Sequence, residues 1–170
     1  MSTSPYDTIE IATPAGSLAV VADDGVVVAA GFAPVEALLA RLDPAAVEAR
    51  GTRARKDLGE VSRAVRAYLG GAVDALDRVP VRQPGGAFTQ AAWQAMREIP
   101  AGQTWTYTEL ATKAGRPTAV RAAGSACARN LVAPFVPCHR VVRTDGTLGG
   151  YYYGLDVKRW LLAHEVAATG

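Results

Sequence analysis

Short stretches of β-forming residues occupy positions 6–12, 17–22 and 26–32 of the chain. Thr-Pro-Ala-Gly separates the first two, and Asp-Asp-Gly separates the second and third. Both of these segments favour turns. The pattern therefore predicts a small antiparallel sheet whose strands follow one another along the chain.

Apolar residues recur at helical spacing in the segments that follow the predicted sheet. Three leucines predict a helix over 34–42, and an amphipathic helix over 58–69 ends at a pair of glycines. Between them, the Arg-rich segment 45–56 is predicted to be a loop or a frayed helix. Segment 79–86, which has two prolines and two glycines, is predicted to be a linker.

The second half of the chain is mostly helical in pattern, with predicted helices at 88–99, 108–114, 118–129 and 157–167. The two central helices are short and flank a Gly-Arg-Pro turn, which is typical of a helix-turn-helix. The proline-containing stretch 134–142 is predicted to be extended.

These elements predict an α+β protein with two domains. We expect residues 1–80 to form a small α/β domain with an antiparallel sheet. We expect residues 81–170 to form a mostly helical domain that carries the helix-turn-helix and the active-site segment.

Composition adds that the chain can form a core: 49% of its 170 residues are hydrophobic and its mean hydropathy is +0.08. No apolar run reaches the roughly 18–20 residues that span a membrane, and the first ten residues lack the features of a signal peptide. Only two cysteines are present, which favours a reducing compartment over a disulfide framework. We therefore expect a cytoplasmic protein with no membrane partner.

Charge is distributed unevenly along the chain. Residues 1–80 carry 8 basic and 11 acidic side chains, whereas residues 81–170 carry 10 and 5. Between Leu110 and Thr144 there are six basic residues and no acidic one. A basic stretch of this kind indicates an anionic partner, and nucleic acid is the most common large one.

Cys138 and His139 are the most informative pair in the sequence, because a thiol with a base in hydrogen-bond reach is a potential nucleophile. Adjacent side chains on an extended strand point to opposite faces, so we expect a bridging water or a local twist to connect them. Glu165 on the last predicted helix is the candidate carboxylate to orient the imidazole. The alternative is that Cys138 is an inert buried thiol. Cys127 is expected to be a packing residue, and the spacing of cysteines and histidines matches no usual zinc site, so no metal is expected.

Several other side chains of the second half have both a functional and an ordinary interpretation. Arg121 could fill the gap in a base stack when a base is extruded, or it could be a solvated surface charge. Tyr107 could help to rotate a nucleotide. The tyrosines at 151–153 could stack on a base or pack on the core. Lys158 and Arg159 are expected to be solvated helix charges.

The segment Pro137-Cys138-His139-Arg140-Val141-Val142 resembles the active-site motif of the O6-alkylguanine-DNA alkyltransferases, also called methylated-DNA–protein-cysteine methyltransferases. The resemblance covers about residues 86–166. Further matching positions, in family order and spacing, are Phe88 to Trp93, Ile99 to Gly102, Tyr107 to Ala111, Arg121 to Gly124, Asn130, Gly150, Tyr151, Gly154, Lys158, and Leu161 to Glu165.

The resemblance implies specific roles at the reactive centre. Cys138 would accept the alkyl group, His139 would deprotonate it through water, Glu165 would orient the imidazole, and Asn130 would brace the active-site turn. Tyr107 would help to rotate the damaged nucleotide.

It also implies contacts with DNA and with the base. Arg121 would take the vacated place in the stack, and the second helix would lie in the minor groove with its small residues against the DNA. The implied DNA contacts are Tyr107, Thr108, Arg116, Arg121, Ala122, Ala123, Ser125 and Thr144. The implied base contacts are Tyr107, Val141, Tyr151, Tyr152 and Tyr153. Tyr153 stands where the family often has glycine, so we expect it to narrow the pocket.

The implied function is DNA repair: one irreversible transfer of an alkyl group, chiefly methyl, from O6-alkylguanine in duplex DNA to the protein's own cysteine, with O4-alkylthymine left open as a second substrate. The transfer needs no cofactor. The expected partner is double-stranded DNA with alkylated bases, bound by a monomer, with cooperativity along DNA left open. Two other classes remain: a non-catalytic sensor of alkylated DNA, and a cysteine hydrolase.

Overall fold

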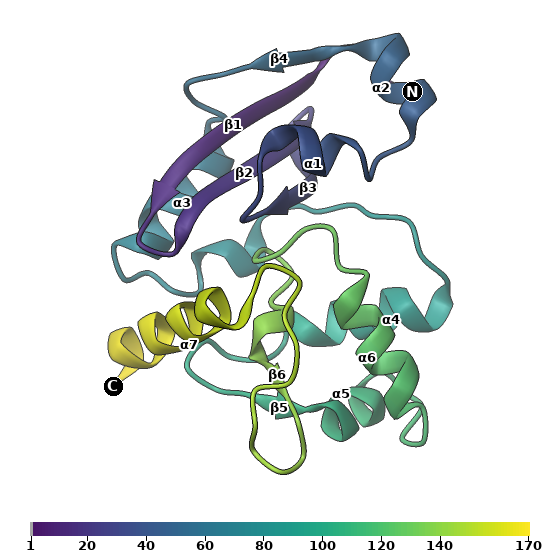
Figure 1. Ribbon diagram of the computed structural model, residues 1–170, viewed down its shortest axis with the longest axis vertical. Coiled ribbons are helices and arrows are strands. Elements are labelled where there is room, and N and C mark those ends of the chain that lie inside the picture. Colours follow the sequence, from purple (N-terminus) through teal and green to yellow (C-terminus); the bar gives the residue numbers. More distant parts are fainter. Residues whose placement is uncertain (1) are drawn as a thin grey trace. The chain divides into compact units, whose positions relative to one another are not determined.

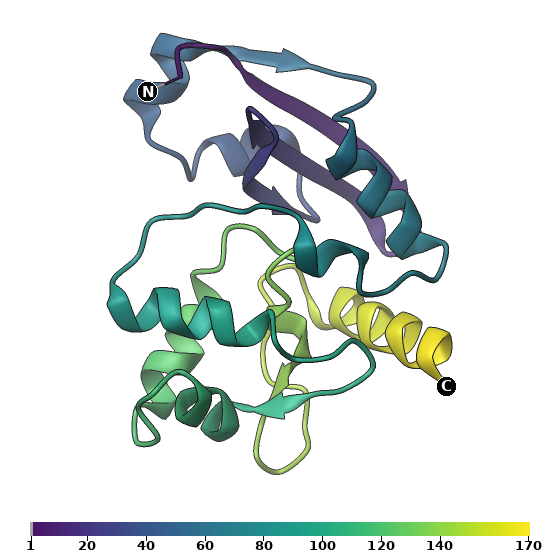
Figure 2. The ribbon, with the colours of Figure 1, turned by 180° about the vertical axis from the view of Figure 1, so that it is seen from behind.

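The computed structural model describes residues 2–170, which divide into two compact units. We call the part up to Gln83 together with Leu131–Phe135 the N-terminal unit, and Pro84–Asn130 together with Val136–Gly170 the C-terminal unit. The predicted α+β class is confirmed (Figures 1 and 2). The sequence placed the boundary after residue 80 and did not predict that residues 131–135 return to the first unit.

The N-terminal unit is built on a four-stranded sheet with the order β3-β2-β1-β4. Strands β1 (Tyr6–Thr13), β2 (Gly16–Asp23) and β3 (Val26–Gly31) form an antiparallel meander, as the sequence predicts. The prediction missed β4 (Thr52–Ala54), which pairs in parallel with β1 and follows helix α2 (Pro44–Arg50).

Helices cover both faces of this sheet. Helix α1 (Val35–Leu39) lies on one face and α3 (Glu60–Leu69) on the other, as the two opposite views show (Figures 1 and 2). A 3-10 turn, η1 (Ala75–Arg78), follows α3.

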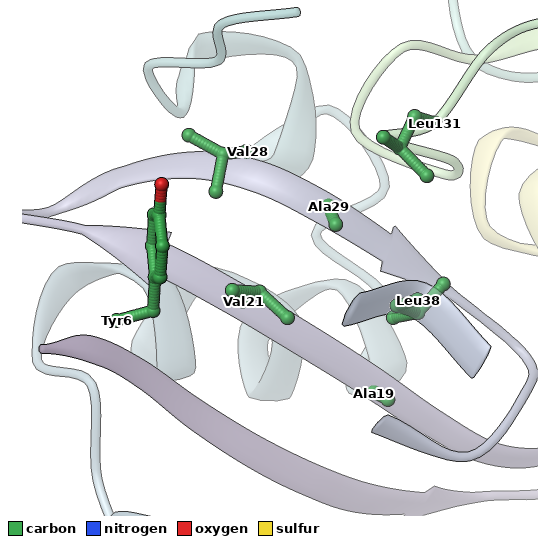
Figure 3. Packing of buried hydrophobic residues seen from close by; sticks show 7 residues of the cluster. All are labelled: Tyr6, Ala19, Val21, Val28, Ala29, Leu38 and Leu131. Atoms are coloured by element: carbon green, nitrogen blue, oxygen red, sulfur yellow. The ribbon is translucent and has the colours of Figure 1, made fainter. Parts of the chain in front are cut away.

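The core under α1 contains side chains from the sheet, from α1 and from the returning segment (Figure 3). Leu38 is 1% exposed, and Leu131 joins the same cluster although it is distant in sequence. The return is fixed by backbone pairing, because the Ala30 N–H donates to the Leu131 carbonyl at 2.8 Å. The Leu131 N–H in turn donates to the Gln83 side chain.

The C-terminal unit begins with three packed helices, α4 (Ala87–Met96), α5 (Tyr107–Lys113) and α6 (Val120–Ala128). Thr106 caps α5 by accepting from the Glu109 N–H, and the Glu109 side chain accepts from the Thr106 N–H, which completes a capping box. Helices α5 and α6 are the predicted helix-turn-helix. The indole of Trp93 fixes α4 against α6, since its Nε1 donates to the Ala126 carbonyl at 2.9 Å.

The reactive segment is a turn and not the predicted extended strand. Residues Cys138–Arg140 form a 3-10 turn, η2, closed by a bond from the Arg140 N–H to the Pro137 carbonyl. Only the next two residues are extended, as β6 (Val141–Val142), which pairs in parallel with β5 (Trp105–Thr106). The last helix, α7 (Leu155–Thr169), packs against η2. Across residues 2–170, no helix combines the length and the apolar character needed to cross a membrane.

Candidate active site

Cys138 lies at the edge of a pocket in the C-terminal unit. Its side chain is buried, at 8% exposure, but it lines a cavity of about 290 Å³. The lining residues are Tyr107, Gly124, Cys127, Ala128, Cys138, Gly150, Tyr151 and Tyr152. The thiol therefore borders the pocket, which favours the nucleophile over the inert buried thiol of the alternative interpretation.

Behind the thiol, three charged or polar side chains form a buried cluster. The Nε2 atom of His139 lies 2.7 Å from Oε2 of Glu165. The guanidinium of Arg140 donates from Nε to Oε1 of the same carboxylate at 2.8 Å, and from NH1 to the Ile99 carbonyl at 2.9 Å. Burial alone would raise the pKa of Glu165, but His139 and Arg140 outweigh it and lower that pKa to about 2. The carboxylate is thus ionised at neutral pH.

Asn130 joins the end of α6 to the reactive turn. It is 2% exposed, and its Nδ2 donates to the Val136 carbonyl at 2.8 Å. Its side chain also hydrogen-bonds the Cys138 thiol. These contacts connect the end of α6 to the reactive turn, and the bracing role of Asn130 in the reaction stays a prediction.

The two thiols of the pocket differ in what opposes their burial. Burial raises the pKa of Cys138, while the Asn130 side chain and the Lys158 charge act in the opposite direction. Burial also raises the pKa of Cys127 and the neighbouring Cys138 raises it further, while the Lys158 charge opposes them without the help of Asn130. Cys127 therefore stays a protonated thiol, and a base is needed to ionise Cys138.

Tyr107, the first residue of α5, forms another wall of the pocket. Burial, together with the neighbouring thiols Cys127 and Cys138, raises the pKa of Tyr107 to about 12. Its hydroxyl is therefore a hydrogen-bond donor throughout the physiological pH range.

The predicted DNA contacts are exposed, with two exceptions. Thr108, Arg116, Arg121, Ala122, Ser125 and Thr144 are all exposed, and Tyr107 is partly buried. Ala123 is fully buried because it lies on the core side of α6, so the prediction that it touches DNA is wrong.

Of the predicted base contacts, Tyr107, Tyr151 and Tyr152 line the pocket. Tyr153 is outside the lining set and packs edge-on against both neighbouring tyrosines, with ring centroids 5.9 Å from Tyr151 and 4.9 Å from Tyr152. Val141 is fully buried, and its carbonyl accepts a hydrogen bond from Lys158. Its contact with a base edge stays a prediction.

The sequence interpretation overlooked two buried cations. Lys158 has no exposed surface, so the expectation of a solvated charge is wrong, while its neighbour Arg159 is exposed as expected. Arg140 is 1% exposed and holds Glu165. Its position directly after His139, in a stretch without acidic residues, was the available signal that it needs a distant carboxylate.

Comparison with known proteins places this geometry in a family. Residues 87–167 match the family model described as the DNA-binding domain of 6-O-methylguanine DNA methyltransferase. A methylated-DNA–protein-cysteine methyltransferase of Methanosarcina barkeri is 42% identical over 111 residues, covering 65% of this chain and 70% of that protein. The chain belongs to the family of methylated-DNA–protein-cysteine methyltransferases.

Two further comparisons show how much of each protein the similarity covers. The bifunctional transcriptional activator/DNA repair enzyme Ada of Escherichia coli is 53% identical over 87 residues, which cover 51% of this chain but only 25% of that protein. The fold extends over the whole chain: the structure of Mycobacterium tuberculosis OGT in complex with DNA superposes with a TM-score of 0.78 at 29% identity, covering 95% of this chain and 94% of the other.

Proposed function

We propose that this protein repairs duplex DNA by moving the methyl group of O6-methylguanine onto Cys138, once and irreversibly. The observation that carries the proposal is the arrangement at the pocket: a reachable thiol, followed directly by an imidazole that a buried carboxylate holds at 2.7 Å. This is the nucleophile, base and orienting group of the triad arrangement.

The first step is removal of the thiol proton. Because Nε2 of His139 faces Glu165, the proton goes to the other ring nitrogen, through a bridging water. The protonated imidazole is then stabilised by the ionised Glu165. The charge of Lys158 and the hydrogen bond from Asn130 both favour the resulting thiolate.

The second step is displacement at carbon. The Cys138 sulfur attacks the methyl carbon in line, the carbon–sulfur bond forms, and the bond between that carbon and guanine O6 breaks with both electrons going to the oxygen. The proton held by His139 is then passed on to the guanine anion through water, so that a neutral guanine leaves and the neutral imidazole is restored. The Tyr107 hydroxyl, which stays protonated because its pKa is about 12, donates a hydrogen bond to the departing base.

The product on the protein is a thioether, which has no good leaving group. The protein therefore acts once and carries no regenerating step. The proposed steps require no metal or organic cofactor.

On the DNA side, we propose that α6 is the element that enters the groove. Arg121, Ala122 and Ser125 are exposed along it, and the pocket borders the same helix through Gly124 and Cys127. The base must leave the helix to reach the pocket, at a cost of a few kcal/mol. Arg121 is the side chain that takes its place.

The test is intact mass after incubation with a duplex that carries one O6-methylguanine. We expect the gain of one methyl group per protein molecule, located on Cys138 by peptide mapping, with no further turnover. An unmodified protein that still binds the duplex would instead identify a sensor. Multiple turnover of an acyl substrate would identify a hydrolase.

Guanine is the proposed base, and O4-alkylthymine is a second substrate to be tested in the same assay. We further propose that the protein works as a monomer in the cytoplasm, consistent with two free cysteines. Light scattering that gave the mass of a dimer would contradict the first part.

A further inference from the structure

Lys158 is a buried cation with three backbone partners. It has no exposed surface, and its Nζ donates to the carbonyls of Val141 at 2.8 Å and Gly150 at 3.2 Å, and also to that of Leu148. A buried ammonium is tolerated only where its donors are satisfied, and Lys carries three of them. Here the three donors bind one carbonyl of β6, that of Val141, and two carbonyls of the loop that follows it.

The loop held by Lys158 leads directly into the pocket wall. Gly150, Tyr151 and Tyr152 line the pocket, and the carbonyls bound by Lys158 include that of Gly150 itself. The Lys158 side chain therefore connects this wall of the pocket to α7.

The same loop also touches Tyr107. At Gly149, where φ is +73°, a Cβ atom would lie only 2.9 Å from the Tyr107 hydroxyl oxygen. The tyrosine ring thus rests against bare backbone between two of the three carbonyls that Lys158 binds, those of Leu148 and Gly150.

We propose that Lys158 is a positioning residue that holds residues 148–150 against Tyr107 and so sets the shape of the pocket for the alkylated base. The inference rests on the proposed function, whose pocket it describes. Arg at this position would keep the charge but not the geometry, because a planar guanidinium does not place three donors as an ammonium does.

The charge of Lys158 also helps to lower the Cys138 pKa, so the two effects must be separated. The assay compares two reactions of the same sulfur in a Cys127→Ser background: single-turnover reaction with free O6-methylguanine, and alkylation by iodoacetamide. Iodoacetamide reports on the thiolate: it is small enough to reach the sulfur through the pocket without the contacts that bind a purine base.

In Lys158→Met we expect the half-saturating concentration of O6-methylguanine to rise about tenfold, with a much smaller change in the iodoacetamide rate. Lys158→Arg should restore the iodoacetamide rate without restoring the base reaction. Arg159→Met, on the exposed side of the same helix, is the control and should behave as wild type. Equal losses in both reactions of Lys158→Met would overturn the proposal, because Lys158 would then act only through the sulfur's charge.

If Lys158→Met does not fold, Gly149→Ala tests the same contact from the other side. Gly146→Ala is its matched control, because Gly146 has φ +86° in the same loop but nothing within 4 Å of the added Cβ. We expect Gly149→Ala alone to weaken O6-methylguanine binding, and equal effects of the two substitutions would also overturn the proposal. Failure of the wild-type protein to take up methyl from DNA would sink the proposed function instead.

Discussion

His139 and Glu165 meet at 2.7 Å in a part of the C-terminal unit where neither side chain is accessible to solvent. The carboxylate is shared, since Arg140 also donates to both of its oxygens. In the proposed mechanism this one buried anion orients the base, and in the fold it neutralises a buried guanidinium. The site and the stability of this unit depend on the same residue.

Glu165→Gln should therefore slow methyl transfer and destabilise the protein together. The loss of an orienting carboxylate should reduce the rate on the order of 100-fold, and an unpaired Arg140 should cost about 3–5 kcal/mol of unfolding free energy. Quenched time courses with the methylated duplex measure the rate of methyl transfer, and urea titrations measure the free energy of unfolding. A variant with normal rate would remove Glu165 from the mechanism.

The same pair predicts a pH dependence of stability. The folded pKa of Glu165, about 2, lies below its ordinary value of 4.5. Its contribution is therefore complete above about pH 4.5 and is lost as the pH falls through 2. The difference in unfolding free energy between wild type and Glu165→Gln should shrink over that window. A difference that stayed constant down to pH 2 would contradict the ionised state assigned to Glu165.

Cys138→Ser should abolish methyl uptake while leaving affinity for undamaged duplex within about twofold, because the hydroxyl is a far weaker nucleophile and the DNA-facing side chains are untouched. Cys127→Ser is the control: this thiol lines the same pocket but stays protonated, so transfer should persist. For both variants, intact mass measures methyl uptake and a binding titration measures the affinity for DNA. Methyl found on Cys127 in wild type would reverse the assignment.

The sequence predicted well what depends on local periodicity. Helices α4 to α7 and the three meander strands follow from residue spacing and turn residues, and the reactive segment was recognised from its Cys-His pair. The elements it missed are short or depend on distant partners. β4 has three residues and β5 has two, too few for a period to show. β6 lies within the stretch 134–142 that was predicted to be extended, but its pairing with β5 was not predicted.

The burial of Lys158 also depends on distant partners and so could not be predicted from the local sequence. Its neighbours Asp156 and Arg159 are exposed and paired with each other, so a charged residue between them is expected to be solvated. Only the folding of the loop near Gly150 over α7 supplies carbonyl partners for its ammonium. The burial of Ala123, in contrast, was accessible from the sequence. Ala123 and Ala126 are three residues apart and therefore share one apolar face of the predicted helix, which is expected to pack inward. Both are fully buried in the structure.

Arg121→Ala should reduce repair of duplex DNA far more than reaction with free O6-methylguanine, by about tenfold or more. Its side chain is exposed and is absent from the pocket lining, so we expect reaction with the free base not to depend on it. Single-turnover rates on the two substrates give the ratio. Equal losses on both would exclude a role for Arg121 in holding the base out of the stack.

Asp23→Asn should destabilise the N-terminal unit by about 3 kcal/mol, because Asp23 is 7% exposed and binds both Arg50 and Arg82. Asp74→Asn breaks an exposed pair with Arg78 and should cost less than about 1 kcal/mol. Urea titrations compare the unfolding free energies of the two variants.

The hydrogen bonds from Arg50 and then Arg82 lower the Asp23 pKa, despite the opposing effect of burial. Its contribution is therefore present above about pH 3.8 and declines below it.

Tyr153→Gly should widen the range of adducts that react. Tyr153 packs edge-on against Tyr151 and Tyr152, and these two side chains line the pocket of about 290 Å³. The wild-type protein should therefore react well with O6-methylguanine and poorly with O6-benzylguanine. Removing the ring that supports the wall lets Tyr151 and Tyr152 move back, so the ratio of benzyl to methyl rates should rise about tenfold. Tyr153→Phe, which keeps the ring, should retain the wild-type ratio. Comparable benzyl and methyl rates in the wild-type protein would show that this wall does not limit the size of the adduct.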